Sequence, residues 1–370
     1  MGEAEMSSSQ GICSGFMPAV VILLLSQPVV ANENVVHHAA PSPQAALASD
    51  EGLARDRQLA SPLQLPAKTR SILGLPNANV GAEAFGAGGH PFTTQRASRP
   101  DGIEPVNSYP WRAVGKLIMT FGNQRAVCTA SVIGKSLLVT AAHCVHNYGS
   151  RDEGFATAMS FQPARHEDQK PYGVWTAKEW WIPKVYHEGQ DICLPEAPGV
   201  VCANDVAVIV LDESEGKAIG DVTGVLNLPP LSNDADKEDA YGYVFFLGQN
   251  ATQLTQLGYP SKDFDGLTMI RTDSLAYFED PNNVILGSNQ TGGSSGGPWL
   301  QNFGTPTSAT GPAPSADQIN TVSAVTSWGY NSGTVKVQGA SRFSRNQIYT
   351  EKTNIRSLVG DACAANPSSC

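Results

Sequence analysis

The amino-acid sequence predicts an all-β protein, built as a barrel or a sandwich. Glycine and proline are frequent, with 36 and 25 copies, while charged residues make up 16% of the chain. This composition favours short strands joined by turns over long helices. From Tyr109 onwards, short apolar runs alternate with turn residues, and no helical period appears before Asn346. Alternating strands and helices, as in a parallel α/β sheet, are therefore not expected.

Six apolar runs, many of them β-branched, have the length of a strand. They are Ala113–Phe121, Ala126–Val132, Ser136–Ala142, Val206–Leu211, Tyr243–Leu247 and Val322–Trp328. One helix is predicted near the C-terminal end, over Asn346–Leu358. The stretch from Asn147 to Gln190 holds Trp175, Trp180 and Trp181, and we expect these rings mainly to pack in the interior.

The N-terminal part of the chain differs from the rest. Residues 16–31 form an apolar run that is too short and too interrupted for a membrane span, and its small-residue end permits signal-peptidase cleavage after Ala31. We therefore expect a signal peptide over residues 1–31. No Lys or Arg precedes the run, which leaves a hydrophobic anchor as the alternative. Residues 32–107 contain no Cys and no Trp, so they are predicted to be a propeptide or disordered leader, or else a linker, before a globular domain over residues 108–370.

Charge and cysteine content restrict the cellular setting. The formal net charge of −10 argues against a nucleic-acid partner, because phosphate binding needs a basic face. Six cysteines remain after signal removal, and an even number in an exported chain suggests three disulfides. Sequence allows 15 pairings; proximity favours Cys128–Cys144, Cys193–Cys202 and Cys363–Cys370. These features predict a secreted or periplasmic protein, a monomer without stable membrane insertion. No cofactor and no metal site are predicted, since no cysteine spacing resembles a zinc site; calcium could bind surface carboxylates, but no ligand can be named.

The motif that points most directly to chemistry is the glycine-rich run around Ser295, Gly292-Gly293-Ser294-Ser295-Gly296-Gly297-Pro298. Glycines allow the tight bend that exposes a reactive hydroxyl and lets a substrate carbonyl approach backbone N–H groups. By itself such a run is also typical of a flexible loop. The rest of the chain must therefore supply a base and an acid.

His143 is the candidate base. It follows the apolar run that ends at Val139 and precedes Cys144, whose bridge to Cys128 would stabilise the loop by about 3 kcal/mol. His146, His166 and His187 lack such neighbours and are expected to be structural. Asp205 is the candidate acid, because it directly precedes a fully apolar strand and a buried carboxylate needs a partner such as an imidazole N–H. Asp191 and Asp212 are the alternatives for the acid.

At these residues the chain resembles the chymotrypsin/trypsin-like serine proteases. The resemblance spans roughly Tyr109 to Gly360, and the motifs that carry it are Thr140–Cys144, Asn204–Leu211, Gly293–Pro298 and Ser327-Trp328-Gly329. It implies two six-stranded antiparallel β-barrels with the site between them and a C-terminal helix. It also implies that Ser295 is the nucleophile, His143 the general base and then acid, and Asp205 its orienting partner. The backbone N–H groups of Gly293 and Ser295 would form the oxyanion hole, and Ser327–Gly329 would pair with the substrate backbone.

Two other hydrolase folds are excluded by chain order. An α/β-hydrolase needs a histidine after its serine, and the last histidine here is His187. A subtilisin-like order would need an acid such as Asp101, which lies in the leader-like segment.

Some positions depart from trypsin. Trypsins carry Asp where this chain has Ser294, and that Asp binds the new N-terminal ammonium on activation, so activation must differ here. In this respect, and in Gly258-Tyr259-Pro260, the chain is similar to the bacterial glutamyl-endopeptidase branch. The acid that selects Lys or Arg in trypsins falls on Asn289, and the pocket histidine of glutamyl endopeptidases falls on Thr326. A neutral specificity pocket is therefore expected.

The leading hypothesis is a serine endopeptidase that acts on proteins or peptides. Two hypotheses from other classes stand beside it. One is a catalytically silent homologue that binds peptides or proteins. The other is an exported adhesion or toxin-like module in which proteolysis is incidental.

Overall fold

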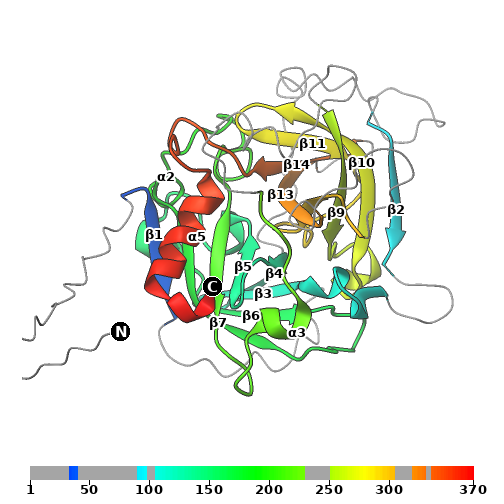
Figure 1. The fold of residues 1–370 in the computed structure, drawn as a ribbon. Coiled ribbons are helices and arrows are strands. Elements are labelled where there is room, and N and C mark those ends of the chain that lie inside the picture. Colours follow the sequence, from blue (N-terminus) through cyan, green and yellow to red (C-terminus); the bar gives the residue numbers. More distant parts are fainter. Residues whose placement is uncertain (1–32, 41–89, 98–104, 230–250, 305–318, 331–334) are drawn as a thin grey trace, which may run out of the picture. The chain divides into compact units, whose positions relative to one another are not determined.

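Two closed antiparallel barrels contain twelve of the strands in the computed structural model (Figure 1). The structure describes residues 33–40, 90–97, 105–229, 251–304, 319–330 and 335–370; the predicted strand at 243–247 lies outside them. In the first barrel the strand order is β7-β6-β3-β4-β5-β8, and an additional pairing of β7 with β8 closes the ring. In the second the order is β11-β14-β13-β12-β9-β10, closed by β10 with β11. The prediction of two six-stranded barrels is confirmed.

The strands of the first barrel are β3 (Val114–Phe121), β4 (Gln124–Val132), β5 (Leu137–Thr140), β6 (Ala158–Pro163), β7 (Trp175–Pro183) and β8 (Ala207–Leu211). The strands of the second are β9 (Ala251–Gly258), β10 (Ile270–Glu279), β11 (Asn283–Gly287), β12 (Pro298–Gln301), β13 (Thr321–Gly329) and β14 (Val337–Arg342). The α-helices described are α2 (Lys184–His187), α3 (Ile219–Thr223) and α5 (Asn354–Ala365). Short 3₁₀ turns are η2 (Pro105–Asn107), η3 (Trp111–Ala113), η4 (Ala142–Cys144), η5 (Arg151–Gly154), η6 (Phe264–Gly266) and η8 (Pro367–Ser369).

Local sequence explains the first hairpin. Phe121 pairs with Gln124 across a two-residue turn, and Gly122 in that turn has φ of +56°. Two-residue hairpins favour a residue of positive φ at this position, because it matches the right-handed twist of the flanking strands. The apolar run of β4 follows directly, so the turn sets the register of a strand that the site depends on.

Two further strands come from the segment for which the sequence predicts a propeptide or leader. β1 (Val35–Ala39) is antiparallel to β7, and β2 (Phe92–Arg96) is antiparallel to β10. The β1 strand is also held by stacking of the His37 ring on Trp181, with centroids 4.5 Å apart. These ten residues therefore add one edge strand to each barrel.

The tryptophans of the segment after His143 pack inside, as the sequence predicts. Trp180 is fully buried, and Trp175 and Trp181 are exposed by only 4% and 6%. The interior of the second barrel is built around another tryptophan, Trp299, which packs with small and aliphatic side chains. Each barrel thus has aromatic packing of its own.

The C-terminal helix exists, but the predicted bounds are wrong. The helix α5 begins at Asn354, eight residues after the predicted start, and continues to Ala365. Asn346 accepts hydrogen bonds from the N–H groups of Ile348 and Tyr349 through its side-chain oxygen, which holds a turn and competes with helix formation. Thr353 then caps the helix by accepting from the N–H of Arg356 at 3.3 Å. Helix α5 packs against β7 and β8 of the first barrel, and against β1 (Figure 1).

Three histidines outside the predicted site have structural contacts. Nε2 of His146 donates to the carbonyl of Arg151 at 2.6 Å, Nε2 of His187 lies 3.0 Å from Asp152, and Nε2 of His166 lies 2.9 Å from Arg96. Burial lowers the pKa of His146 to about 4, against the opposing effect of its backbone hydrogen bond. This ring therefore stays neutral in the folded protein at neutral pH.

We expect Thr353→Ala to lower the free energy of unfolding by about 1 kcal/mol, because the first turn of α5 loses its side-chain cap. Chemical denaturation of the two proteins measures this difference. Thr353→Ser, which keeps the hydroxyl, is the matched control and should stay close to wild type. Equal stability of the alanine variant and wild type would contradict the assigned start of the helix.

We expect His146 to make the folded state sensitive to acid. Its folded pKa is below the unfolded value, so its contribution to stability is complete above about pH 6.5 and is lost as the pH falls towards 4, where only the unfolded chain takes up the proton. His146→Gln keeps an N–H donor but cannot titrate. Thermal melting between pH 8 and 4 should therefore show a shallower loss of stability in the variant. Parallel curves would contradict the buried, neutral state of this ring.

Candidate active site

The pairing of β5 with β8 brings His143 and Asp205 together. The two strands are antiparallel, and Thr140, the last residue of β5, lies opposite Ala207, the first of β8. His143 follows β5 in the turn η4, and Asp205 precedes β8. The residues just after one strand and just before its antiparallel partner meet at the same edge of the barrel.

Asp205 is fully buried, and both of its carboxylate oxygens are used. Oδ1 accepts from the backbone N–H of His143 at 2.9 Å, and Oδ2 lies 2.7 Å from Nδ1 of the same residue. Since a buried carboxylate accepts only from a donor, Nδ1 carries the ring proton in the neutral imidazole and Nε2 presents its lone pair.

A serine from the second barrel also reaches this carboxylate. The hydroxyl of Ser327 in β13 is in hydrogen-bond contact with Oδ2 of Asp205 and with the carbonyl of Val200. From the sequence, Ser327 is expected only to bind substrate, and its contact with Asp205 is not predicted. The two residues are 122 positions apart, and nothing local in the sequence links them.

The loop that carries Ser295 lies between β11 and β12 and against the end of β5. The carbonyl of Ser295 accepts from the N–H of Thr129 at 2.7 Å. A Cβ on Gly296 would lie 1.9 Å from Oγ1 of Thr140 and 3.0 Å from the N–H of Ala141. Only glycine permits this approach, which places the Ser295 loop beside the chain that leads to His143.

His143 Nε2 is buried and has no hydrogen-bond partner within the described part of the chain, Ser295 included. In the absence of substrate such a contact is often long and tightens only on binding. The free lone pair of Nε2 is what a general base requires.

The peptide between Gly292 and Gly293 is held in one orientation by Ser261. The carbonyl of Gly292 accepts from the N–H of Ser261 at 2.8 Å and from its hydroxyl at 3.0 Å. Because the peptide is planar and trans, the N–H of Gly293 points the opposite way. Gly293 has φ of +96°, and a Cβ there would lie 2.4 Å from the carbonyl oxygen of Tyr259.

Thr129 connects the loop that carries Ser295 to the first barrel, and the sequence does not predict this role of Thr129. Its hydroxyl donates to the carbonyl of Gly293 at 2.8 Å and accepts from the N–H of Tyr259 at 3.0 Å. Its neighbour Cys128 is bonded to Cys144, which follows His143. One short stretch of β4 thus contacts both the loop that carries Ser295 and the loop that carries His143. Its position beside Cys128 was the signal that could have identified it.

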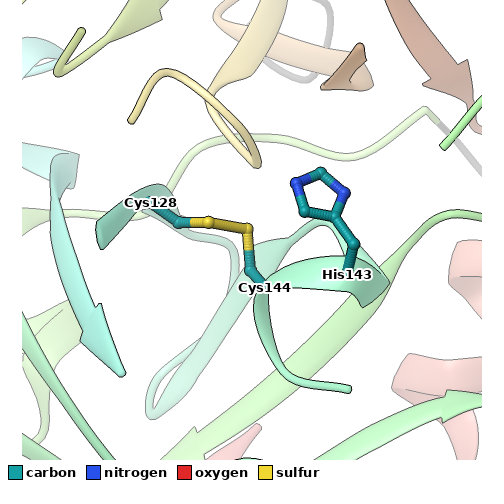
Figure 2. A group of neighbouring side chains, drawn as sticks. All are labelled: Cys128, His143 and Cys144. Atoms are coloured by element: carbon teal, nitrogen blue, oxygen red, sulfur yellow. A yellow bond between two sulfur atoms is a disulfide. The ribbon is translucent and has the colours of Figure 1, made fainter. Parts of the chain in front are cut away.

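Figure 2 shows the histidine ring above the disulfide between Cys128 and Cys144. These three residues have donor atoms close enough to hold a metal ion, and so do Asp191, Cys193 and Cys202 among the described residues. The sulfurs of each group are joined in a disulfide, and a metal ligand must be a thiolate. Neither group fits a metal ion. The third disulfide joins Cys363 and Cys370, so all three pairs are neighbours in sequence.

Neither of the two alternative acids has a hydrogen bond to His143 within the described residues. Asp212 is exposed and follows β8 rather than preceding it. Asp191 is buried, but its carboxylate accepts from Asn204 and Ile192. The contacts of His143 therefore favour Asp205 over both.

Three more residues are expected to bind substrate, and their hydrogen bonds differ: Thr326, Asn289 and Trp328. Oγ1 of Thr326 is buried and accepts from Nε1 of Trp299 at 2.9 Å and from Nε2 of Gln256 at 3.0 Å. Oδ1 of Asn289 is buried without a hydrogen-bond partner among the described residues. Trp328 donates from Nε1 to Asn283 at 2.9 Å. The contacts described for these positions involve neutral groups.

Beyond Thr326, whose backbone still bonds to Gly296 and Gly297, no described strand pairs with β13 on the β12 side. Val325 lies opposite Pro298, the first residue of β12, while Trp328 and Gly329 pair only with β14 among the described strands. Within the part of the chain that the structure describes, the segment Ser327–Gly329 thus has one free edge. Beneath it lies the side chain of Gln338, whose Cγ would be 3.3 Å from a Cβ on Gly329.

Ser294 is buried in a neutral hydrogen-bond network. Its hydroxyl donates to the carbonyl of Thr291 at 2.6 Å and accepts from Nε2 of Gln338 at 3.3 Å. Gln338 in turn contacts Gln256 and the hydroxyl of Ser288. Uncharged groups therefore occupy the surroundings of this side chain.

Comparisons with known proteins agree with this geometry. The sequence model of the trypsin family matches residues 101–348. Over 233 residues the chain is 24% identical to the glutamyl endopeptidase of Bacillus licheniformis, covering 63% of this chain and 61% of that protein. Over 120 residues it is 28% identical to an extracellular metalloprotease of Bacillus subtilis, covering 32% of this chain and 34% of that protein. The chain thus spans about three fifths and one third of these relatives.

A solved structure supports the fold. The protease Anisep from Arthrobacter nicotinovorans superimposes with a TM-score of 0.50 at 22% identity, over 74% of this chain and 100% of that one. Among the described residues, no helix combines the length and the apolar character that crossing a membrane requires. With the family match extending over both barrels, the chain belongs to the trypsin-like serine protease family.

Proposed function

We propose that this protein is a serine endopeptidase that hydrolyses peptide bonds through an acyl-enzyme, with His143, Asp205 and Ser295 as its triad. The observation that carries the proposal is the contact of Nδ1 of His143 with the buried carboxylate of Asp205 at 2.7 Å. It fixes the tautomer in which Nε2 can accept a proton. The position of the Ser295 loop against Thr140 and Ala141 supports the choice of nucleophile.

In the proposed mechanism, Nε2 of His143 takes the proton from Oγ of Ser295 as that oxygen attacks the carbonyl carbon of the scissile bond. The imidazolium is stabilised by Asp205, which stays ionised. It then gives the proton to the nitrogen of the leaving amine, and the peptide bond breaks. A water molecule, deprotonated by the same ring, hydrolyses the resulting ester and frees Ser295.

The negative charge on the substrate oxygen would be stabilised by the N–H groups of Gly293 and Ser295. The hydrogen bonds from Ser261 to the Gly292 carbonyl support this role, because they hold the next N–H in one orientation before substrate arrives. Donors that are already oriented cost no reorganisation during the reaction, and one such donor contributes a factor of about 10² to 10³ in kcat. The free edge of Ser327–Gly329 would hold the substrate backbone as an added strand.

We further propose secretion, or export to the periplasm, with cleavage of the signal peptide after Ala31. Three disulfides are typical of oxidising compartments. Residues 32–107 would form a leader, and its complete removal would also take the edge strands β1 and β2 from the barrels. Because Ser294 cannot form an ion pair with a new N-terminus and lies in a neutral network, activation would not depend on such a pair.

Ser295→Ala should abolish cleavage of a denatured protein substrate such as casein, because no nucleophile remains. We expect a loss of at least about 10³-fold in kcat, with the fold unchanged. Ser150→Ala, at an exposed serine, is the matched control and should retain wild-type activity. Wild-type protein without activity would favour the silent binding homologue. An active Ser295→Ala variant would indicate a different nucleophile.

A peptide library should be cleaved after uncharged side chains, because Asn289 and Thr326 offer amide and hydroxyl groups where charged or titratable selectors would be needed. Mass spectrometry of the cleaved library gives the profile. A profile dominated by Glu, Lys or Arg at the cleaved bond would contradict a neutral pocket. The same library with Ser295→Ala protein provides the background.

A further inference from the structure

Asp191 is a second buried carboxylate that lies close to Asp205 in the folded chain. Asp191 is exposed by only 8%. Oδ2 accepts from the backbone N–H of Asn204 at 2.8 Å, and Oδ1 accepts from the side-chain amide of Asn204 at 2.8 Å and from the N–H of Ile192 at 2.9 Å. The carboxylate thus holds Asn204 by both its backbone and its side chain. Asn204 is the residue directly before Asp205.

The other end of the Asn204 side chain is also held. Its Oδ1 accepts from the side-chain amide of Asn346 at 2.8 Å and from that of Asn354 at 3.2 Å. Asn354 is the first residue of α5. The amide plane of Asn204 is therefore fixed between Asp191 on one side and the start of the C-terminal helix on the other. A rotation of Asn204 would break these contacts and shift the peptide that carries Asp205.

The loop between Asp191 and Asp205 contains a disulfide, and it also contacts a side chain that binds Asp205. Cys193 and Cys202 are joined by a disulfide within it. The carbonyl of Val200, inside this loop, contacts the hydroxyl of Ser327, which also contacts Asp205. The segment that begins at Asp191 is therefore linked to Asp205 in two ways. One link is the adjacent residue Asn204, and the other is Ser327, which contacts both Val200 and Asp205.

We propose that Asp191 is a positioning residue for the reaction: its carboxylate clamps Asn204 and so holds Asp205 in register with His143. This inference rests on the proposed function, since it assumes that Asp205 and His143 act in catalysis. Asp191 touches neither substrate nor the reacting atoms. Its effect passes through the backbone of Asn204.

The clamp requires an ionised carboxylate, because all three contacts are N–H donors and a protonated oxygen would offer a donor to one of them. Burial and, to a smaller extent, the nearby charge of Asp205 raise the pKa of Asp191 to about 6, although the hydrogen bonds from Asn204 and Ile192 oppose this rise. The other titratable groups that face it are the hydroxyls of Tyr148, Tyr186 and Tyr349. Below about pH 6, protonation would therefore loosen Asn204 in the folded enzyme.

The test compares Asp191→Asn with wild type on a short peptide substrate. The asparagine would direct an amide group at N–H donors, so we expect kcat to fall about 10- to 100-fold, the scale that misplacement of a reacting group produces, with KM within about twofold. Below about pH 6, log(kcat/KM) of wild type should fall more steeply than that of the variant, because protonation of Asp191 adds one proton to the wild-type acid limb. Asp212→Asn, at an exposed acid, is the matched control and should leave rate and slope unchanged. Asp191→Glu, which keeps the charge, should recover part of the rate.

A folded Asp191→Asn variant with wild-type kcat and an acid limb as steep as that of wild type would overturn the inference. If the variant does not fold, the wild-type profile decides, since a slope of one in wild type excludes a second ionisation. Failure of the proposed function has a different signature, because wild type and Ser295→Ala would then be equally inactive at every pH.

Discussion

The burial of the Asp205 carboxylate is the constraint on which the rest of this structure depends. A charge removed from water costs several kcal/mol unless donors replace the lost hydration. Here the donors are the N–H and Nδ1 of His143 and the hydroxyl of Ser327. Two of the three come from the first barrel and one from the second, so the two barrels must meet at this carboxylate for the charge to be satisfied.

The contact between the barrels also holds the loop that carries Ser295. Thr129 of the first barrel holds both the Ser295 and the Gly293 carbonyls, while Ser261 of the second fixes the Gly292 peptide. Stability and chemistry therefore share contacts, because the hydrogen bonds of Thr129 and Ser327 join the barrels and also hold groups that the proposed reaction uses. Such preorganisation is the usual source of electrostatic catalysis in enzymes.

The strand pattern of the sequence predicts an all-β barrel or sandwich, and the two barrels follow only from the resemblance that the motifs and their order along the chain carry. His143 beside Cys144, and Asp205 before an apolar strand, are patterns visible within a few residues. The contact of Ser327 with Asp205 is not, because it joins segments 122 residues apart. The triad and the oxyanion residues remain proposals that the geometry supports.

The failures of prediction also have physical reasons. The helix start was misplaced because Asn346 and Thr353 both prefer turns and caps, and only their side-chain hydrogen bonds reveal which one begins the helix. The strands β1 and β2 were not predicted, because short segments rich in His, Thr and Gln have little apolar pattern and depend on an edge supplied by β7 or β10. The sequence offers Asp191 only as an alternative acid, because its hydrogen bonds to Asn204 depend on how the loop between them folds and leave no local pattern.

The central claim is that His143 activates Ser295, and reaction with a fluorophosphonate tests it most directly. The processed, folded protein is treated with the reagent, and peptide mass mapping locates the adduct, with His143→Ala as the control. The account predicts one adduct, on Ser295, that is absent from the control. No adduct on folded wild-type protein, or one that forms equally well without the histidine, would contradict it.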